Sequence, residues 1–154
     1  MRLAADAKGL LRNNCAGDGT GYFLTDANVL LSAVLGGRAR AVLEHSNVEE
    51  VFTAEATLAE VQEYAPALAK NKRRSTDLVL LAVATLPVTA LDSSVYARSV
   101  AEVRRRIGRR DPNDIDILAL ALHFGLPLWS NDNDFEVAGI EWHTTADLLA
   151  RFRP

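Results

Sequence analysis

The sequence predicts an α/β fold in which helices cover both faces of a central, mainly parallel sheet of five strands. Short apolar segments, typical of strands buried on both faces, alternate with longer segments whose apolar residues recur at helical spacing. Parallel strands need crossover connections, so this alternation places helices on both sides of the sheet. No internal repeat and no second domain interrupts the pattern.

Length and composition describe one ordinary globular domain. The chain has 154 residues, of which 49% are hydrophobic and 24% charged. Its one cysteine, Cys15, excludes an internal disulfide framework and agrees with a reducing compartment. The longest apolar run, residues 78–86, is too short to span a bilayer, and Asp6 and Lys8 interrupt any signal peptide. We therefore expect a cytoplasmic protein with no membrane partner.

The first 21 residues are predicted to lie outside the core, as a leader or tail that is partly disordered. Residues 1–12 place their leucines on one helical stripe, and residues 13–21 (NNCAGDGTG) form a turn-rich linker. The domain is expected over residues 22–154.

The first half of that domain is predicted to contain two strands, at residues 22–25 and 51–53. Asn28 is suited to cap a helix that ends at Gly36-Gly37, and residues 38–45 follow as another helix. Thr57 and Glu60 have capping-box spacing at the start of a longer helix, which Pro66 is expected to kink or restart.

The second half is predicted to contain three strands, at residues 88–90, 128–129 and 140–143. Helices are expected at residues 75–85, from Asp92 or Ser93 to Gly108, from Asp114 towards Gly125, and at residues 146–152 after a Thr144 or Thr145 cap. An acidic loop, SNDND, follows the strand at 128–129.

Four acids occupy the ends of predicted elements: Asp26, Glu60, Asp114 and Asp132. Ligands of open parallel sheets bind beyond the carboxyl ends of the strands, so these acids converge if the first and fourth strands are neighbours. Gathered carboxylates repel one another, and a divalent cation relieves that repulsion. Their oxygen ligands suit Mg²⁺ or Mn²⁺, whereas the single cysteine and three histidines lack zinc-ligand spacing.

Each of these acids also has a purely structural interpretation. Asp26 and Asp114 can be helix caps, Glu60 the second half of a capping box, and Asp132 an Asx turn. Asp111, Asp116 and Asp134 compete for the same roles. Asp116 lies about 200° around the helix from Asp114, so both cannot face one pocket. Asp134 shares the side of Asp132 if the backbone there is extended.

Positive charge is concentrated in two segments although the net charge is −3. Residues 104–110 (RRRIGRR) hold five arginines, and residues 70–74 (KNKRR) form a second basic group. Such segregation is able to present a basic rim beside an acidic pocket, although exposed arginines on a helix are also typical of solvation and i,i+4 pairing.

The four-acid pattern resembles the PIN-domain family of metal-dependent ribonucleases, which includes VapC-like toxins. An Asp follows a strand with a small polar residue two positions on (Asp26-Ala27-Asn28), and a helix carries a Glu in TLAEVQEY. Asp114 precedes the alanine-rich ILALAL, and a Thr/Ser-x-Asp-x-Asp-Phe run ends the pattern at Phe135. Two features depart from the family: Ser130 replaces the commoner Thr, and DPNDID offers three acids for the third motif.

The resemblance covers residue 22 to the C-terminus and implies a three-layer α/β/α sandwich with a metal-dependent endoribonuclease site. It implies that Asp26, Asp114 and Asp132 hold Mg²⁺ or Mn²⁺, with Glu60 coordinating the ion or orienting the water. Asn28, Ser130 and Asp134 are expected to support the site. RNA backbone contacts are expected from Arg104, Arg105, Arg106, Arg109 and Arg110. A homodimer and a cognate antitoxin partner are also implied.

Three rival interpretations differ from this expectation. Haloacid-dehalogenase-type enzymes carry a second Asp where this chain has Asn28, and a receiver domain needs a late Lys that does not follow Asp132. Neither nucleotide-binding glycine motif is present. A non-catalytic PIN-like module that binds RNA or a protein remains the alternative to a nuclease.

Overall fold

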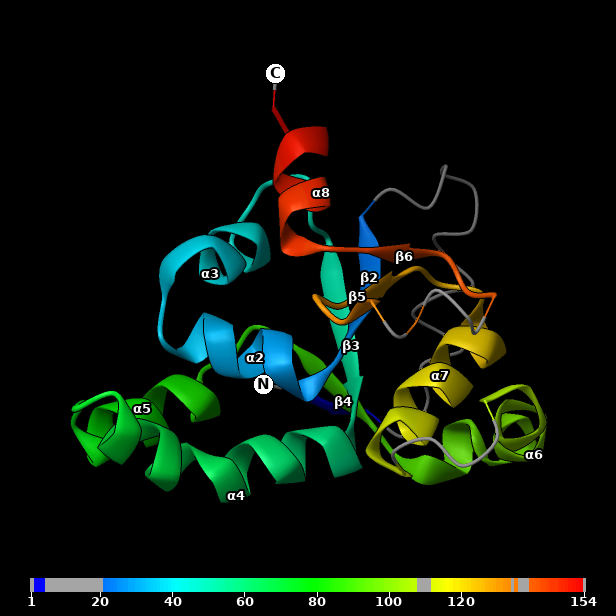
Figure 1. Ribbon diagram of the computed structural model, residues 1–154, viewed down its shortest axis with the longest axis horizontal. Coiled ribbons are helices and arrows are strands. Elements are labelled where there is room, and N and C mark those ends of the chain that lie inside the picture. Colours follow the sequence, from blue (N-terminus) through cyan, green and yellow to red (C-terminus); the bar gives the residue numbers. More distant parts are fainter. Residues whose placement is uncertain (1, 5–20, 108–111, 134, 136–138, 154) are drawn as a thin grey trace.

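The computed structural model describes residues 2–4, 21–107, 112–133, 135 and 139–153 (Figure 1). In this part of the chain, six strands form one sheet in the order β1-β4-β3-β2-β5-β6. Every neighbouring pair is parallel. The strands are β1 (Arg2–Ala4), β2 (Tyr22–Thr25), β3 (Glu50–Ala54), β4 (Thr89–Leu91), β5 (Leu128–Trp129) and β6 (Trp142–His143).

Helices cover both faces of this sheet. They are α2 (Ala27–Val34), α3 (Gly37–Leu43), α4 (Glu55–Asn71), α5 (Thr76–Ala84), α6 (Ala97–Ile107), α7 (Pro112–Phe124) and α8 (Thr145–Arg151), with a short 3-10 turn at Ser93–Val95. Figure 1 shows α6 and α7 on the side of the sheet opposite α2, α3, α5 and α8. None of the described helices combines the length and apolar composition needed to cross a bilayer.

Alternating strand residues supply the two halves of the core. Phe23 and Trp129 belong to the apolar cluster formed with α2, α3, α5 and α8. Their neighbours Leu24 and Leu128 belong to the cluster formed with α6 and α7. Successive side chains of a strand point to opposite faces, so apolar residues at consecutive positions require helices on both sides. The predicted α/β/α sandwich is confirmed.

The predicted helix at residues 1–12 is wrong for residues 2–4. These residues form β1 and pair with β4, with Leu3 level with Ala90. The helical spacing of the leucines was outweighed by the free backbone groups along the edge of β4, which a further strand satisfies. Part of the predicted leader therefore belongs to the sheet. Residues 5–20 lie outside the described residues, and a domain boundary at residue 22 stays a prediction.

Two predicted helix starts are also wrong. The cap of α2 is Asp26, whereas Asn28 lies exposed in the first turn. Helix α4 begins at Glu55, so Thr57 is buried inside the helix and forms no capping box with Glu60. Helix α4 also continues through Pro66 without restarting.

Candidate metal and nucleic-acid site

The site is built around Asp26, directly after the central strand β2. Its Oδ1 accepts a hydrogen bond from the backbone N–H of Val29 at 2.9 Å, which caps α2. Its Oδ2 accepts a hydrogen bond of 2.5 Å from the hydroxyl of Ser130, directly after β5. Thr25 is level with Trp129 in the sheet, so the next residues of the two strands meet across the edge. The sequence alone did not give this strand order.

Buried hydroxyl groups tie the three strands of this edge together. Thr53 of β3 donates to the carbonyl of Thr25 at 2.9 Å, and Thr25 donates to the carbonyl of Trp129 at 3.2 Å. Each of the three strands thus has a hydroxyl group at its carboxyl end: Thr25 in β2, Thr53 in β3, and Ser130 directly after β5. The two threonine bonds fix the strand ends relative to one another, and the Ser130 hydroxyl holds the Asp26 carboxyl.

The surroundings of Asp26 make its carboxyl harder to ionise than a carboxyl in water. Burial raises the pKa of this carboxyl above its usual value, and the charge of Asp132 raises it further. The hydrogen bonds from Ser130 and Val29 lower the pKa but do not offset burial. Asp26 is only 7% exposed. A buried carboxyl beside a second acid is typical of functional sites.

Asp132 lies in the loop after β5, close enough to act on Asp26 through its charge. The side chain is half-buried, and its backbone N–H donates to the Ser130 hydroxyl at 3.1 Å. Ser130 therefore links the two acids: its hydroxyl donates to one and accepts from the backbone of the other. The structure brings together Asp26, Ser130 and Asp132 as three of the predicted site residues.

Glu60 and Asp114 lie on two helices that pack against each other, α4 and α7. Figure 1 shows the first turn of α7 beside the N-terminal end of α4. Both side chains are half-buried. Among the described residues, however, no three Asp, Glu, His or Cys side chains lie close enough to share one metal ion. The convergence of all four acids therefore stays a prediction.

The remaining predicted site residues are Asp134 and the arginines of residues 104–110, of which the structure describes only some. Asp134, Arg109 and Arg110 lie outside the described residues. Arg105 and Arg106 are exposed at the end of α6, and both pair with Glu102. Their positive charge is thus partly neutralised within the helix, as i,i+4 pairing allows. Arg104 is exposed on the same turn, and RNA binding by this group stays a prediction.

Two further acids at the same edge were not predicted as site residues. Glu55 follows β3 and Asp92 follows β4. Both act through their charge on Tyr96, whose buried hydroxyl donates to Asp116 at 2.5 Å. Burial and these acids raise the pKa of Tyr96 well above its usual range. The signal that identified Asp26, an acid immediately after a buried strand, applies equally to Glu55 and Asp92.

The loop after β5 is anchored from the neighbouring strand and helix. The indole N–H of Trp142 donates to the Ser130 carbonyl at 2.8 Å. The Asn131 side-chain oxygen accepts from the backbone N–H of Thr145 at 2.9 Å, and the Trp129 indole donates to the Thr145 hydroxyl. Because Ser130 and Asp132 flank Asn131, these bonds also restrain the site.

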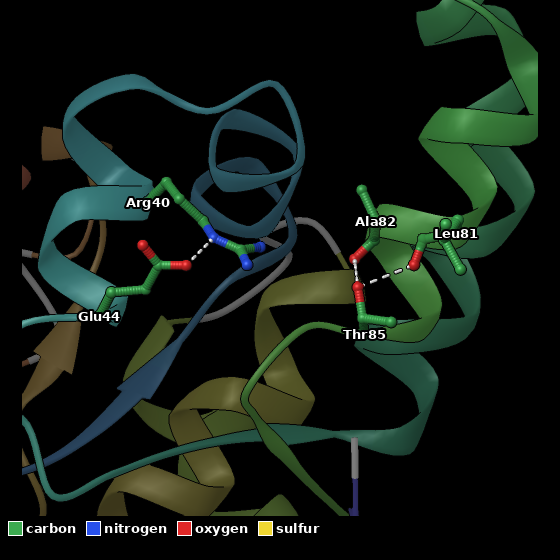
Figure 2. A network of polar contacts seen from close by, with 5 residues as sticks. All are labelled: Arg40, Glu44, Leu81, Ala82 and Thr85. Carbon is green, nitrogen blue, oxygen red and sulfur yellow. Dashed lines mark hydrogen bonds and ion pairs between the residues drawn. The ribbon is translucent and has the colours of Figure 1, made fainter.

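A separate groove of mixed polar and apolar lining lies between α2 and α5. It has a volume of about 340 Å³, and its lining includes Leu35, Leu78 and Leu81. Leu78 is 67% exposed and Leu81 59% exposed, which is unusual for large apolar side chains. Figure 2 shows Leu81, Ala82 and Thr85 on α5, across from the α3 segment where Arg40 pairs with Glu44.

The chain belongs to the PIN-domain family. The PIN domain model matches residues 24–153, which include every described helix and all strands from β3 to β6. No curated protein matches the chain in sequence. The predicted resemblance to this family is therefore confirmed.

Several solved structures share the fold. PAE2754 from Pyrobaculum aerophilum has 20% identity and a TM-score of 0.61, covering 88% of this chain and 97% of its own. VapBC2 from Rickettsia felis, bound to a DNA fragment from its promoter, has 14% identity and a TM-score of 0.57, covering 80% and 98%. VapC20 from Mycobacterium tuberculosis, a toxin that cleaves the sarcin-ricin loop, has 19% identity and a TM-score of 0.53, covering 77% and 95%.

The donor atoms at Asp26 and Asp132 suit a hard divalent cation. They are carboxylate oxygens, and the adjacent side chain of Ser130 adds a hydroxyl. Oxygen ligands of this kind favour Mg²⁺ or Mn²⁺ over zinc. A cation would also offset the charge of Asp132 that raises the pKa of Asp26.

Proposed function

We propose that this chain is a metal-dependent endoribonuclease that hydrolyses RNA phosphodiester bonds, and that it acts as the toxin of a toxin–antitoxin pair. The observation that carries the proposal is the buried Asp26, held by Ser130 beside Asp132 at the carboxyl edge of a PIN-domain sheet. The fold shared with VapC20, which is described as a toxin that cleaves the sarcin-ricin loop, supports the same conclusion.

In this proposal, Asp26 and Asp132 hold Mg²⁺ or Mn²⁺, Asp114 completes the ligand set, and Glu60 binds the ion or orients the attacking water. The ion, when bound, lowers the pKa of water and stabilises charge that develops on the phosphate. Ser130 keeps the Asp26 carboxyl in a single orientation through its hydrogen bond. The arginines of α6 bind the RNA backbone without reading its sequence.

The test is cleavage of a labelled RNA by the purified protein with Mn²⁺ or Mg²⁺, comparing Asp114→Asn with Asp116→Asn. Both acids lie on α7, but Asp116 accepts a hydrogen bond from Tyr96 and is about 200° around the helix from Asp114. We expect Asp114→Asn and Asp26→Asn to lose more activity than the roughly 10–100-fold lost when a group only orients a metal ligand. Full activity in a folded Asp114→Asn variant would remove that residue from the site.

The alternative is a PIN-like module that binds RNA or a protein without cleaving it. The low identity to the solved neighbours leaves this function open to measurement. Calorimetric titration with Mn²⁺, together with the cleavage assay, separates the two. Binding of metal and RNA without cleavage by the wild-type protein would favour the module.

A cognate antitoxin and a second copy of the chain are the proposed protein partners. The exposed leucines of α5 give the chain an apolar surface on which a partner is able to pack. Light scattering of the purified chain, alone and after co-expression with the protein encoded beside it, tests both partners. A monomer that forms no complex with that protein would contradict them.

A further inference from the structure

A second cavity adjoins the candidate site on the side of α8. It lies between α2, α3 and the start of α8 and has a volume of about 410 Å³. Its polar lining comprises Ser32, Arg38, Asn131 and Thr145. Asn131 stands between Ser130 and Asp132 in the chain, so the cavity and the candidate site share one loop.

The cavity is positively charged, whereas the neighbouring site is acidic. Among the described residues that line it, Arg38 is the one that carries a charge. The arginine is exposed and makes no ion pair with another described residue. Arg40, two residues further along α3, pairs instead with Glu44 at 2.6 Å (Figure 2). The guanidinium of Arg38 is therefore available to a ligand, whereas that of Arg40 is already paired with Glu44.

Asn131 adds hydrogen-bond donors that the fold does not use. Its side-chain oxygen accepts from the backbone N–H of Thr145, which fixes the amide group against α8. The two N–H groups of the same amide form no hydrogen bond with another described residue. A fixed amide donor, an exposed serine hydroxyl and a guanidinium together match the acceptor oxygens of a phosphate.

We infer that this cavity is the subsite for the RNA backbone next to the cleaved bond, with Arg38 contacting a phosphate. The inference rests on the proposed nuclease function and identifies where its substrate binds. A strand whose reacting phosphate lies at Asp26 and Asp132 extends along the shared loop into the cavity. There the positive charge of Arg38 offsets the repulsion between the RNA phosphates and the acids of the site. This subsite is separate from the arginines of α6, which lie beyond the opposite face of the sheet (Figure 1).

The test measures binding of a single-stranded oligoribonucleotide over a range of salt concentrations, with Ca²⁺ replacing Mn²⁺ to suppress cleavage. Each phosphate contact contributes about 0.7 to the slope of log K against log salt for a single strand. We expect Arg38→Gln to weaken binding and to reduce this slope by about 0.7. The control, Arg40→Gln, changes the net charge equally on the same helix and should leave the slope unchanged.

A second variant, Ser32→Glu, places a carboxylate at the cavity from an exposed position of α2. We expect it to weaken RNA binding further while circular dichroism shows the wild-type fold. Equal slopes for wild type, Arg38→Gln and Arg40→Gln would overturn the subsite. If the wild-type protein still cleaves RNA in that case, the proposed function survives. A wild-type protein that neither binds nor cleaves RNA would overturn both.

Discussion

Replacement of Ser130 by Ala tests how strongly the fold depends on the group that holds Asp26. The Ser130 side chain is completely buried and Asp26 is 7% exposed, so water does not replace the lost hydrogen bond easily. Hydrogen bonds to charged groups contribute about 1.5–3 kcal/mol to stability. The second bond, from the half-exposed Asp132 backbone, is more readily replaced by water and adds little. We expect Ser130→Ala to lower the free energy of unfolding by about 2 kcal/mol at neutral pH.

The measurement is urea unfolding of wild type, Ser130→Ala, Asp26→Asn and the double variant. Such a cycle isolates the interaction between the two side chains from other effects of each substitution. The loss caused by Ser130→Ala should be smaller when Asp26 is already neutral, because the acceptor then carries no charge. A Ser130→Ala variant within about 0.5 kcal/mol of wild type, the range of ordinary surface substitutions, would refute the reasoning.

Three further predictions concern titration, capping and a buried tyrosine. Because burial raises the pKa of Asp26, the folded state binds this proton more tightly than the unfolded chain, and stability falls as pH rises from the unfolded to the folded pKa. Asp26→Asn should therefore gain stability relative to wild type in urea unfolding as the pH rises above the usual pKa of an aspartate, and an equal difference at every pH would contradict this. Thr144→Ala removes the capping box formed with Asp147 at α8 and should lower the stability measured in thermal unfolding by about 1 kcal/mol. An unchanged stability would contradict the capping role of Thr144. Tyr96→Phe removes the hydrogen bond to Asp116 and should lower the free energy of unfolding in urea by about 1 kcal/mol. The cost is limited because water reaches the half-buried carboxylate, and a stabilised variant would show that the hydrogen bond does not contribute to stability.

Periodicity predicted most of the sheet because its strands are buried on both faces. The apolar pairs at Phe23-Leu24 and Leu128-Trp129 need partners on either side, and that requirement is visible in sequence. Strand β1 was missed because three residues carry little local signal, and its partner β4 lies about ninety residues away in the chain. Pairing with a distant edge decided the structure of that segment.

The candidate site was predicted in part for a similar reason. An acid directly after a buried strand identified Asp26, and the acidic loop identified Asp132. Their contact depended on β2 and β5 being neighbours, which is a property of the strand order and not of either segment. The hydroxyls of Thr25 and Thr53 were missed because a threonine in a strand is ordinary until its hydrogen-bond partner is known.

The pairing of β1 with β4 has a practical consequence for work with this protein. A shortened version that begins at residue 22 would leave the backbone N–H and C=O groups along one side of β4 uncovered. An exposed strand edge pairs with extended segments of other molecules, so the truncated protein would tend to self-associate. This association would be unrelated to any physiological dimer. Mass measurements intended to find the natural assembly should therefore use the intact N-terminus.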